Sequence, residues 1–194
     1  MTTPKIYLLD WNLGMANEWH ARFDDVPNVI ISTESFECFM WEHSDDVDCI
    51  VSPANAYGLM DGGYDLAITR FLGEEAQQMV QKEILARFCG EQTVGTALSV
   101  FCGGYTLIHT PTMRVPSTIL DDMVVYAATR SALIEAMRVG VRSMVFPALG
   151  AGTGGVPYAR VAFLMRAAYD QVLNPPAHLD WDYALAQPLP DRDR

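Results

Sequence analysis

Two stretches of the sequence combine glycines with polar side chains in patterns suited to binding a small anionic ligand. The first is CIVSPANAYGLMDGGYDLAI, residues 49–68, and the second is VFPALGAGTGGVP, residues 145–157. In each stretch, a short apolar run typical of a buried strand leads through a loop into helical sequence. Sheets built this way bind ligands at the carboxyl ends of their strands. We therefore expect both loops to lie at a binding site.

The second stretch has the composition of a phosphate-binding loop. Gly150, Gly152, Gly154 and Gly155 lie between a predicted strand and a helix that we expect to begin near Pro157. Successive backbone amides next to a helix N-terminus form a nest for an anion such as a diphosphate. The alternative is a merely flexible loop, and four glycines in six residues favour the nest.

The first stretch carries the polar side chains that could act on a ligand. Asn55 follows the predicted strand and can both donate and accept hydrogen bonds. Gly62 and Gly63 suit a close approach of the backbone to a ligand or a positive φ. Asp65 begins the next helix, so it has two possible roles: a site carboxylate, or an ordinary N-cap in an ordinary loop.

A dinucleotide-binding enzyme is the other reading of the glycine loop. Gly150, Gly152 and Gly155 satisfy the pattern GxGxxG. That fingerprint requires a further strand that ends in an acid about 20 residues later. Here the helix runs into Asn174-Pro175-Pro176 and no strand follows, so the pattern gives little support to a nicotinamide-dependent oxidoreductase.

Strands and helices are predicted to alternate along the chain. The predicted strands span residues 5–9, 29–32, 48–52, 97–101, 105–110 and 141–149. The predicted helices span residues 15–23, 36–42, 66–88 with a break at Gly73, 121–139 and 157–173. This order predicts an α/β fold with a mostly parallel sheet covered on both faces. We expect residues 1–176 to form a single domain, followed by a tail rich in proline and charge at residues 177–194.

Composition limits the partners of this domain. The chain has 194 residues, a net charge of −11 and no run of lysines or arginines. Free nucleic acid is therefore an unlikely partner, because a polyanion needs a basic surface. No apolar run approaches the roughly 20 residues that span a bilayer, and residues 1–12 do not resemble a signal peptide. We expect a cytoplasmic protein without a membrane partner.

The cysteines and histidines give no sign of a metal. Four cysteines are spread along the chain without a CxxC pair, which predicts reduced thiols in the core. His20, His43 and His178 show no metal-ligand spacing, and His109, at a strand end, is expected to be a structural hydrogen-bonding residue. We expect no metal and no cofactor.

The order of four segments resembles the macro domain family. DCIVSPAN is followed by a Gly-Gly-x-Asp turn that opens a helix, then by YTLIHTPT and by VFPALGAGTGGVP, and the resemblance covers residues 28–173. It implies a three-layer α/β/α sandwich with ADP-ribose as the ligand. Some members of the family hydrolyse ADP-ribosyl linkages or ADP-ribose 1″-phosphate.

The resemblance also implies roles for particular residues. Asn55 resembles the asparagine that binds the distal ribose, and Asp65 resembles the acid that activates water in some hydrolytic members. Glu34 is the nearest candidate for the acid that reads the adenine amino group. We therefore expect Asn55 and Asp65 to be catalytic. The full set of predicted ligand-binding residues is Glu34, Ser52, Asn55, Asp61, Gly62, Gly63, Tyr64, Asp65, Gly150, Ala151, Gly152, Thr153, Gly154 and Gly155.

Some positions depart from the family pattern. Ser52 stands where many members carry asparagine, Asp61 stands in place of a glycine, and Tyr64 replaces a small aliphatic residue. Gly154 replaces an aromatic residue that often covers the distal ribose. The usual last strand, with its site for an adenine-stacking aromatic, is absent, and residues 5–9 are expected to supply an additional strand. Two functions therefore remain: an ADP-ribosyl hydrolase, and a non-catalytic module that reads ADP-ribose or a related metabolite.

Overall fold

The sheet has six strands, of which five are parallel. The computed structural model describes residues 3–186. Its strands are β1 (Lys5–Leu9), β2 (Val29–Ser32), β3 (Cys49–Ser52), β4 (Leu98–Cys102), β5 (Tyr105–His109) and β6 (Ser143–Pro147). They lie in the order β2-β1-β6-β3-β5-β4, and only β4 runs antiparallel to its neighbour. The predicted mostly parallel sheet is confirmed.

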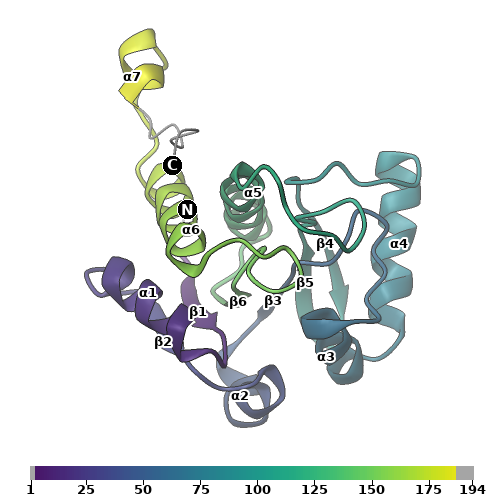
Figure 1. Cartoon of the computed structure of the whole chain (residues 1–194). Coiled ribbons are helices and arrows are strands. Elements are labelled where there is room, and N and C mark those ends of the chain that lie inside the picture. The colour runs from purple at the N-terminus through teal and green to yellow at the C-terminus, as the bar shows by residue number, and fades with distance from the viewer. Residues whose placement is uncertain (1–2, 187–194) are drawn as a thin grey trace.

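Helices cover both faces of this sheet. They are α1 (Leu13–Phe23), α2 (Phe36–His43), α3 (Gly63–Leu72), α4 (Glu75–Phe88), α5 (Met123–Val139), α6 (Tyr158–Leu173) and α7 (Trp181–Ala186), with a short 3-10 helix at Ser44–Asp46. One core cluster joins the sheet to α1, α5 and α6, and the other joins it to α2, α3 and α4 (Figure 1). Alternate residues of β1 point to opposite layers, since Ile6 and Leu8 belong to the first cluster and Tyr7 and Leu9 to the second. This is the predicted three-layer α/β/α sandwich.

The register brings the carboxyl ends of the parallel strands to one edge. Leu9 of β1 is paired with Ser32 of β2 on one side and with Pro147 of β6 on the other. Ser52 of β3 is paired with His109 of β5. The loops that follow β1, β2, β3, β5 and β6 therefore emerge along the same edge.

Several predicted boundaries shift by a few residues. The helical stretch predicted at 66–88 does break at Gly73, where φ is +90°, but its first part begins earlier, at Gly63. The helix predicted from residue 121 begins at Met123, because the Asp121 carboxylate accepts a hydrogen bond from the Met123 amide at 3.1 Å. The strand predicted at 141–149 is shorter, and its last residues already belong to the glycine loop.

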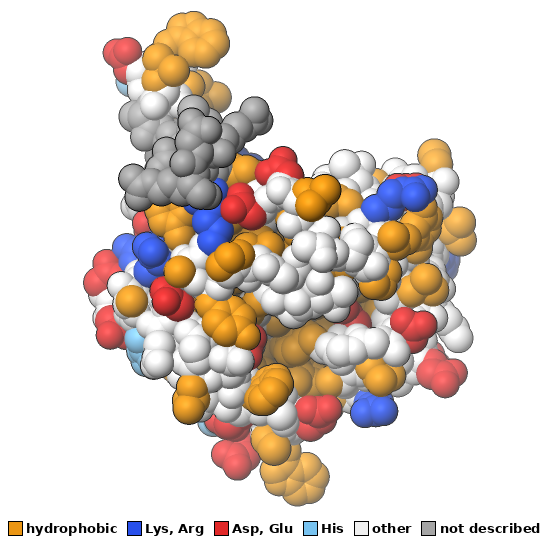
Figure 2. Space-filling view, in the orientation of Figure 1, with side chains coloured by type: hydrophobic (Ala, Val, Ile, Leu, Met, Phe, Trp, Pro, Cys, Tyr) orange, Lys and Arg blue, Asp and Glu red, His pale blue; other side chains and the backbone are white. Residues whose placement is uncertain are grey.

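The expected tail is partly described. It contains α7, which projects from the body in Figure 1 and carries apolar side chains on its surface in Figure 2; Trp181 is 80% exposed. The rest of the tail, residues 187–194, lies outside the described residues. Within the described part, no helix is long and apolar enough to cross a membrane.

The cysteines are free, but only two are core residues. Cys49 and Cys102 are buried, as predicted. Cys38 and Cys89 are exposed, because each lies on the outer side or at the end of a helix that covers the sheet. The prediction of four core thiols is therefore wrong for these two.

Candidate functional site

A cavity of about 410 Å³ lies along the edge where the parallel strands end. In Figure 2 the surface is hollowed near the centre of the view, below the loop that joins β6 to α6. Its walls come from the loops after β1, β2, β3, β5 and β6. The predicted site residues that line it are Glu34, Asn55, Asp61, Gly62, Gly63, Tyr64, Asp65, Gly150, Gly152, Thr153 and Gly154. Both loops singled out in the sequence therefore meet at one cavity.

The glycine loop lines this cavity and carries backbone amides without a hydrogen-bond partner among the described residues. The Val156 amide donates to the Gly150 carbonyl at 3.1 Å, and the Gly155 amide donates to the Gly152 carbonyl at 3.0 Å. These bonds fold the loop into consecutive turns. Among the described residues, no hydrogen bond engages the amides of Gly152, Thr153 or Gly154. The site therefore offers three successive donors to an anion, close to the N-terminus of α6.

Two of the glycines have opposite steric surroundings. A Cβ on Gly154 would lie 2.5 Å from the Gly150 carbonyl oxygen, so no side chain fits there without moving the backbone. A Cβ on Gly152, which lines the cavity, would have no atom within 4 Å. An aromatic side chain therefore does not fit at position 154 as this loop is folded, whereas the protein leaves space for a side chain at position 152.

Asp65 is a buried carboxylate on the cavity wall. The Ser52 hydroxyl donates to its Oδ1 at 2.6 Å. Burial raises the pKa of Asp65 to about 7, although hydrogen bonds from Ser52 and from the amides of Ala54 and Asp65 act in the opposite direction. The N-cap of α3 is Gly62, which makes no side-chain capping bond. The interpretation of Asp65 as the N-cap of this helix is therefore wrong, because Gly62 holds that position and the Asp65 carboxylate accepts from Ser52.

Three predicted site residues do not line the cavity. Ser52 is fully buried at the end of β3 and reaches the site only through Asp65. Ala151 and Gly155 belong to the glycine loop but do not line the cavity, and Ala151 packs against the core instead.

The Asn55 side chain is largely occupied in shaping its own loop. Its Oδ1 accepts from the amides of Tyr57 at 3.1 Å and Leu59 at 3.3 Å, and its Nδ2 donates to the Leu59 carbonyl at 2.8 Å. Asn55 is 6% exposed and still contributes to the cavity wall. One Nδ2 hydrogen remains for a ligand, because the amide group has two.

His109 lies behind this loop and supports it. Its Nδ1 is 2.7 Å from the Gln92 side-chain oxygen, and the residue is fully buried. Burial lowers the pKa of His109 to about 4, so the imidazole is neutral. Its predicted role as a structural hydrogen-bonding residue fits this position, since it does not line the cavity.

The sequence did not point to the residues that close the cavity at β1. Asp10 and Trp11 follow β1 directly and line the cavity, and Trp11 is 76% exposed. The Asn12 amide donates to Oδ1 of Asp10 at 2.8 Å, and burial raises the pKa of that carboxyl group. The available sequence signal for these residues was an acid and an aromatic residue directly after a buried strand. It was missed because no glycines accompany them there.

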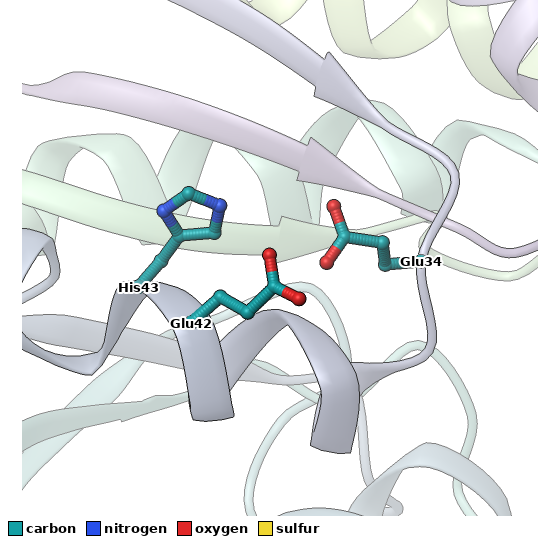
Figure 3. A group of neighbouring side chains, drawn as sticks. All are labelled: Glu34, Glu42 and His43. Atoms are coloured by element: carbon teal, nitrogen blue, oxygen red, sulfur yellow. The ribbon is translucent and has the colours of Figure 1, made fainter.

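Glu34 takes part in a second group of side chains. It lines the cavity, and it also lies beside Glu42 and His43 at the end of α2 (Figure 3). One ligand atom from each of these residues lies within 4.8 Å of the others, so the group could hold a metal ion. The spacing of these residues along the chain could not reveal the group, because Glu34 precedes α2 whereas Glu42 and His43 lie at its C-terminal end.

The fold and the cavity together define an α/β domain with a cavity at the carboxyl edge of its sheet, lined in part by a glycine-rich loop. Residues 51–165 match the family model described as Macro domain. The chain belongs to the macro domain family, as the sequence resemblance indicated.

Relatives and solved structures agree with this membership. An uncharacterized protein of Aquifex aeolicus is 38% identical over 113 residues, which cover 58% of this chain and 66% of that protein. A protein of Escherichia fergusonii named O-acetyl-ADP-ribose deacetylase is 34% identical over 121 residues, 60% of this chain and 67% of that protein. The Oceanobacillus iheyensis macrodomain with ADP superimposes with a TM-score of 0.57 at 23% identity, covering 66% of this chain and 71% of that one. The macrodomain of Mycobacterium tuberculosis DarG gives 0.56 at 23% identity, covering 66% and 84%.

The raised pKa of Asp65 predicts a pH-dependent stability. In the folded state the carboxyl group titrates at about 7, against 3.8 for the free group. Between these values the folded state holds a proton that the unfolded state has lost, so the free energy of unfolding falls as the pH rises. Asp65→Asn removes this pH-dependent loss of stability. When the pH rises from 5 to 7, the free energy of unfolding of the variant should therefore increase by on the order of 2 kcal/mol relative to that of the unmodified protein. Denaturant unfolding at a series of pH values measures the difference.

The matched control for this measurement is Asp61→Asn, which changes an exposed carboxylate in the loop just before α3. Its unfolding free energy should follow that of the unmodified protein. If the two variants show the same pH dependence, Asp65 does not carry the raised pKa.

Proposed function

We propose that this protein binds ADP-ribose, with the diphosphate held by the glycine loop between β6 and α6. The observation that carries this proposal is the row of unbonded amides at Gly152, Thr153 and Gly154, three residues that line a cavity of nucleotide size. Within residues 3–186, no lysine or arginine lines that cavity, so we take backbone amides as the donors to an anion. The ADP in the Oceanobacillus iheyensis macrodomain and the name of the Escherichia fergusonii relative support the same ligand class.

The strand order suggests how the ligand lies. Along the sheet edge, β6 stands between β1 and β3. With the diphosphate over the loop after β6, one end of the ligand lies over β1 and β2 and the other over β3. Trp11 supplies a flat, exposed aromatic surface at the first end, which suits a base. Asn55 and Asp65 stand at the other end, which suits the distal ribose.

Asp10 and Glu34 both offer carboxylates at the base end. Oδ1 of Asp10 is held by the Asn12 amide, which leaves Oδ2 for the ligand. Oε1 of Glu34 accepts from the Ser32 hydroxyl at 2.9 Å, and the side chain lies beside α2. Either carboxylate can accept a hydrogen bond from the amino group of adenine, and Asp10 lies closer along the chain to the stacking surface of Trp11.

We further propose that the protein hydrolyses a terminal ADP-ribosyl linkage. A carboxyl group with a pKa of about 7 exchanges its proton near neutral pH, as a general base must. Asp65, oriented by Ser52, would take a proton from water while the water oxygen attacks the anomeric carbon of the distal ribose, and the bond to the leaving group breaks. The alternative function is a reader of ADP-ribose, in which the same cavity binds the ligand and Asp65 performs no proton transfer.

Gly152→Val tests the phosphate loop. Its side chain would meet no protein atom within 4 Å of the Cβ, so the fold should survive, but it would occupy the space of the diphosphate. We expect ADP-ribose binding, measured by calorimetry, to be lost while the melting temperature stays within a few degrees. Gly152→Ala is the matched control and should weaken binding less. Unchanged affinity in a folded Gly152→Val variant would contradict the placement of the diphosphate.

Trp11→Ala tests the orientation of the ligand. Stacking of a base on an aromatic side chain is worth roughly 1–3 kcal/mol, so ADP-ribose affinity should fall about 5- to 150-fold. Trp41, which is 87% exposed and does not line the cavity, provides the control variant Trp41→Ala. Equal affinities for the two variants would place the base elsewhere and leave the diphosphate assignment intact.

Asp65→Asn separates the enzyme from the reader. The amide keeps the shape of the carboxylate but cannot take a proton, so release of ADP-ribose from mono-ADP-ribosylated protein or nucleic acid should fall by about 10²- to 10⁴-fold. The affinity for ADP-ribose should stay within a few-fold. Asn55→Ala should weaken both, because it also removes the bonds that shape the loop between Tyr57 and Leu59.

Two results would change the assignment. If the unmodified protein binds ADP-ribose but releases none from several kinds of linkage, the protein is a reader. If Asp65→Asn retains full turnover, another group, such as a phosphate oxygen of the substrate, must activate the water.

A further inference from the structure

Three potential metal ligands from two elements converge beside the cavity. Glu34 lies in the connection between β2 and α2, and Glu42 and His43 end α2. A ligand atom of each lies within 4.8 Å of the others. Figure 3 shows both carboxylates and one nitrogen of the imidazole turned toward a common space. A metal bound at about 2.0–2.2 Å from each donor needs them roughly 3.3 Å apart, so a small rotation of side chains would close the site.

Residues outside the group hold two of its members in place. Nδ1 of His43 is 3.4 Å from Oδ2 of Asp46, which leaves Nε2 on the side of the carboxylates. The imidazole also packs against the rings of Tyr7 and Phe39. The Ser32 hydroxyl donates to Oε1 of Glu34, which leaves Oε2 without a partner among the described residues. Carboxylates and hydroxyls that orient the first ligands are typical of metal sites in proteins.

The charge of the group is uncompensated. No lysine or arginine forms an ion pair with Glu34 or Glu42 in the described part of the chain. Two neighbouring carboxylates repel each other unless a cation or a proton lies between them. An imidazole nitrogen beside them favours a transition metal over Mg²⁺ or Ca²⁺, which prefer oxygen ligands alone.

We propose that Glu34, Glu42 and His43 form a binding site for a divalent transition metal, with Zn²⁺ as the ion to test. Three protein ligands leave at least one coordination position for water. The ion would cross-link the connection between β2 and α2, which carries Glu34, to the C-terminal end of α2. Because Glu34 also lines the cavity, the ion would stabilise one wall of it. The site does not depend on ADP-ribose being the ligand of that cavity.

Calorimetric titration of the chelator-treated full chain with ZnCl₂ tests this site. We expect one Zn²⁺ per chain and a rise in melting temperature with zinc concentration. Glu42→Gln should weaken binding at least about 10-fold without loss of structure, because Glu42 is exposed. His43→Gln should abolish binding. Asp46→Asn, which does not touch the metal, should weaken binding about 10-fold through the orientation of His43.

Two controls guard against adventitious binding. Glu37→Gln changes another exposed carboxylate of α2, and Cys38→Ser removes an exposed thiol of the same helix; both variants should bind zinc as the unmodified protein does. The proposal is overturned if the unmodified protein takes up no zinc. It is equally overturned if zinc binding survives both Glu42→Gln and His43→Gln, or if it is lost in Cys38→Ser.

Discussion

The parallel register of five strands is the constraint on which the site depends. Because β1, β2, β3, β5 and β6 run in one direction, their carboxyl ends meet at one edge, and every loop after them contributes to the same cavity. Leu9 beside Pro147 and Ser52 beside His109 fix this alignment. A change of register would separate Asp65 from the glycine loop. Residues more than a hundred positions apart in the chain therefore form a single site.

The second constraint is electrostatic. Among the residues that the structure describes, the cavity is lined by Asp10, Glu34, Asp61 and Asp65 and by no lysine or arginine, in a chain with a net charge of −11. A diphosphate could bind there only where carboxylates are distant or neutral and where amides point at it. In the binding mode that we propose, the three unbonded amides of the glycine loop would meet the second requirement. Burial of Asp65 contributes to the first, since a carboxyl group with a pKa of about 7 is partly protonated at neutral pH.

The sequence predicted the fold, and most of the predicted site residues do line the cavity, because both depend on local patterns. Apolar runs such as residues 49–52 predicted the buried strands, and four glycines before a proline predicted the loop between β6 and α6. The sequence could not show that Ser52 would form a hydrogen bond with Asp65, since that contact depends on how the loop between β3 and α3 places the helix against the strand. It also missed Asp10 and Trp11, which strand order brings to the cavity, and the group of Glu34, Glu42 and His43, which helix packing brings together beside it.

The pair of Ser52 and Asp65 connects stability with chemistry. Serine in place of the asparagine found in many family members gives Asp65 a hydroxyl donor at 2.6 Å inside a buried site. That bond stabilises the carboxylate form, but desolvation outweighs it, so the pKa stays raised. A fully solvated aspartate would be too weak a base to take a proton from water near neutral pH, and a more deeply isolated one would remain protonated. In the hydrolytic mechanism that we propose, the partial compensation by Ser52 would keep Asp65 between these limits, at a cost in folding free energy that grows as the carboxylate ionises.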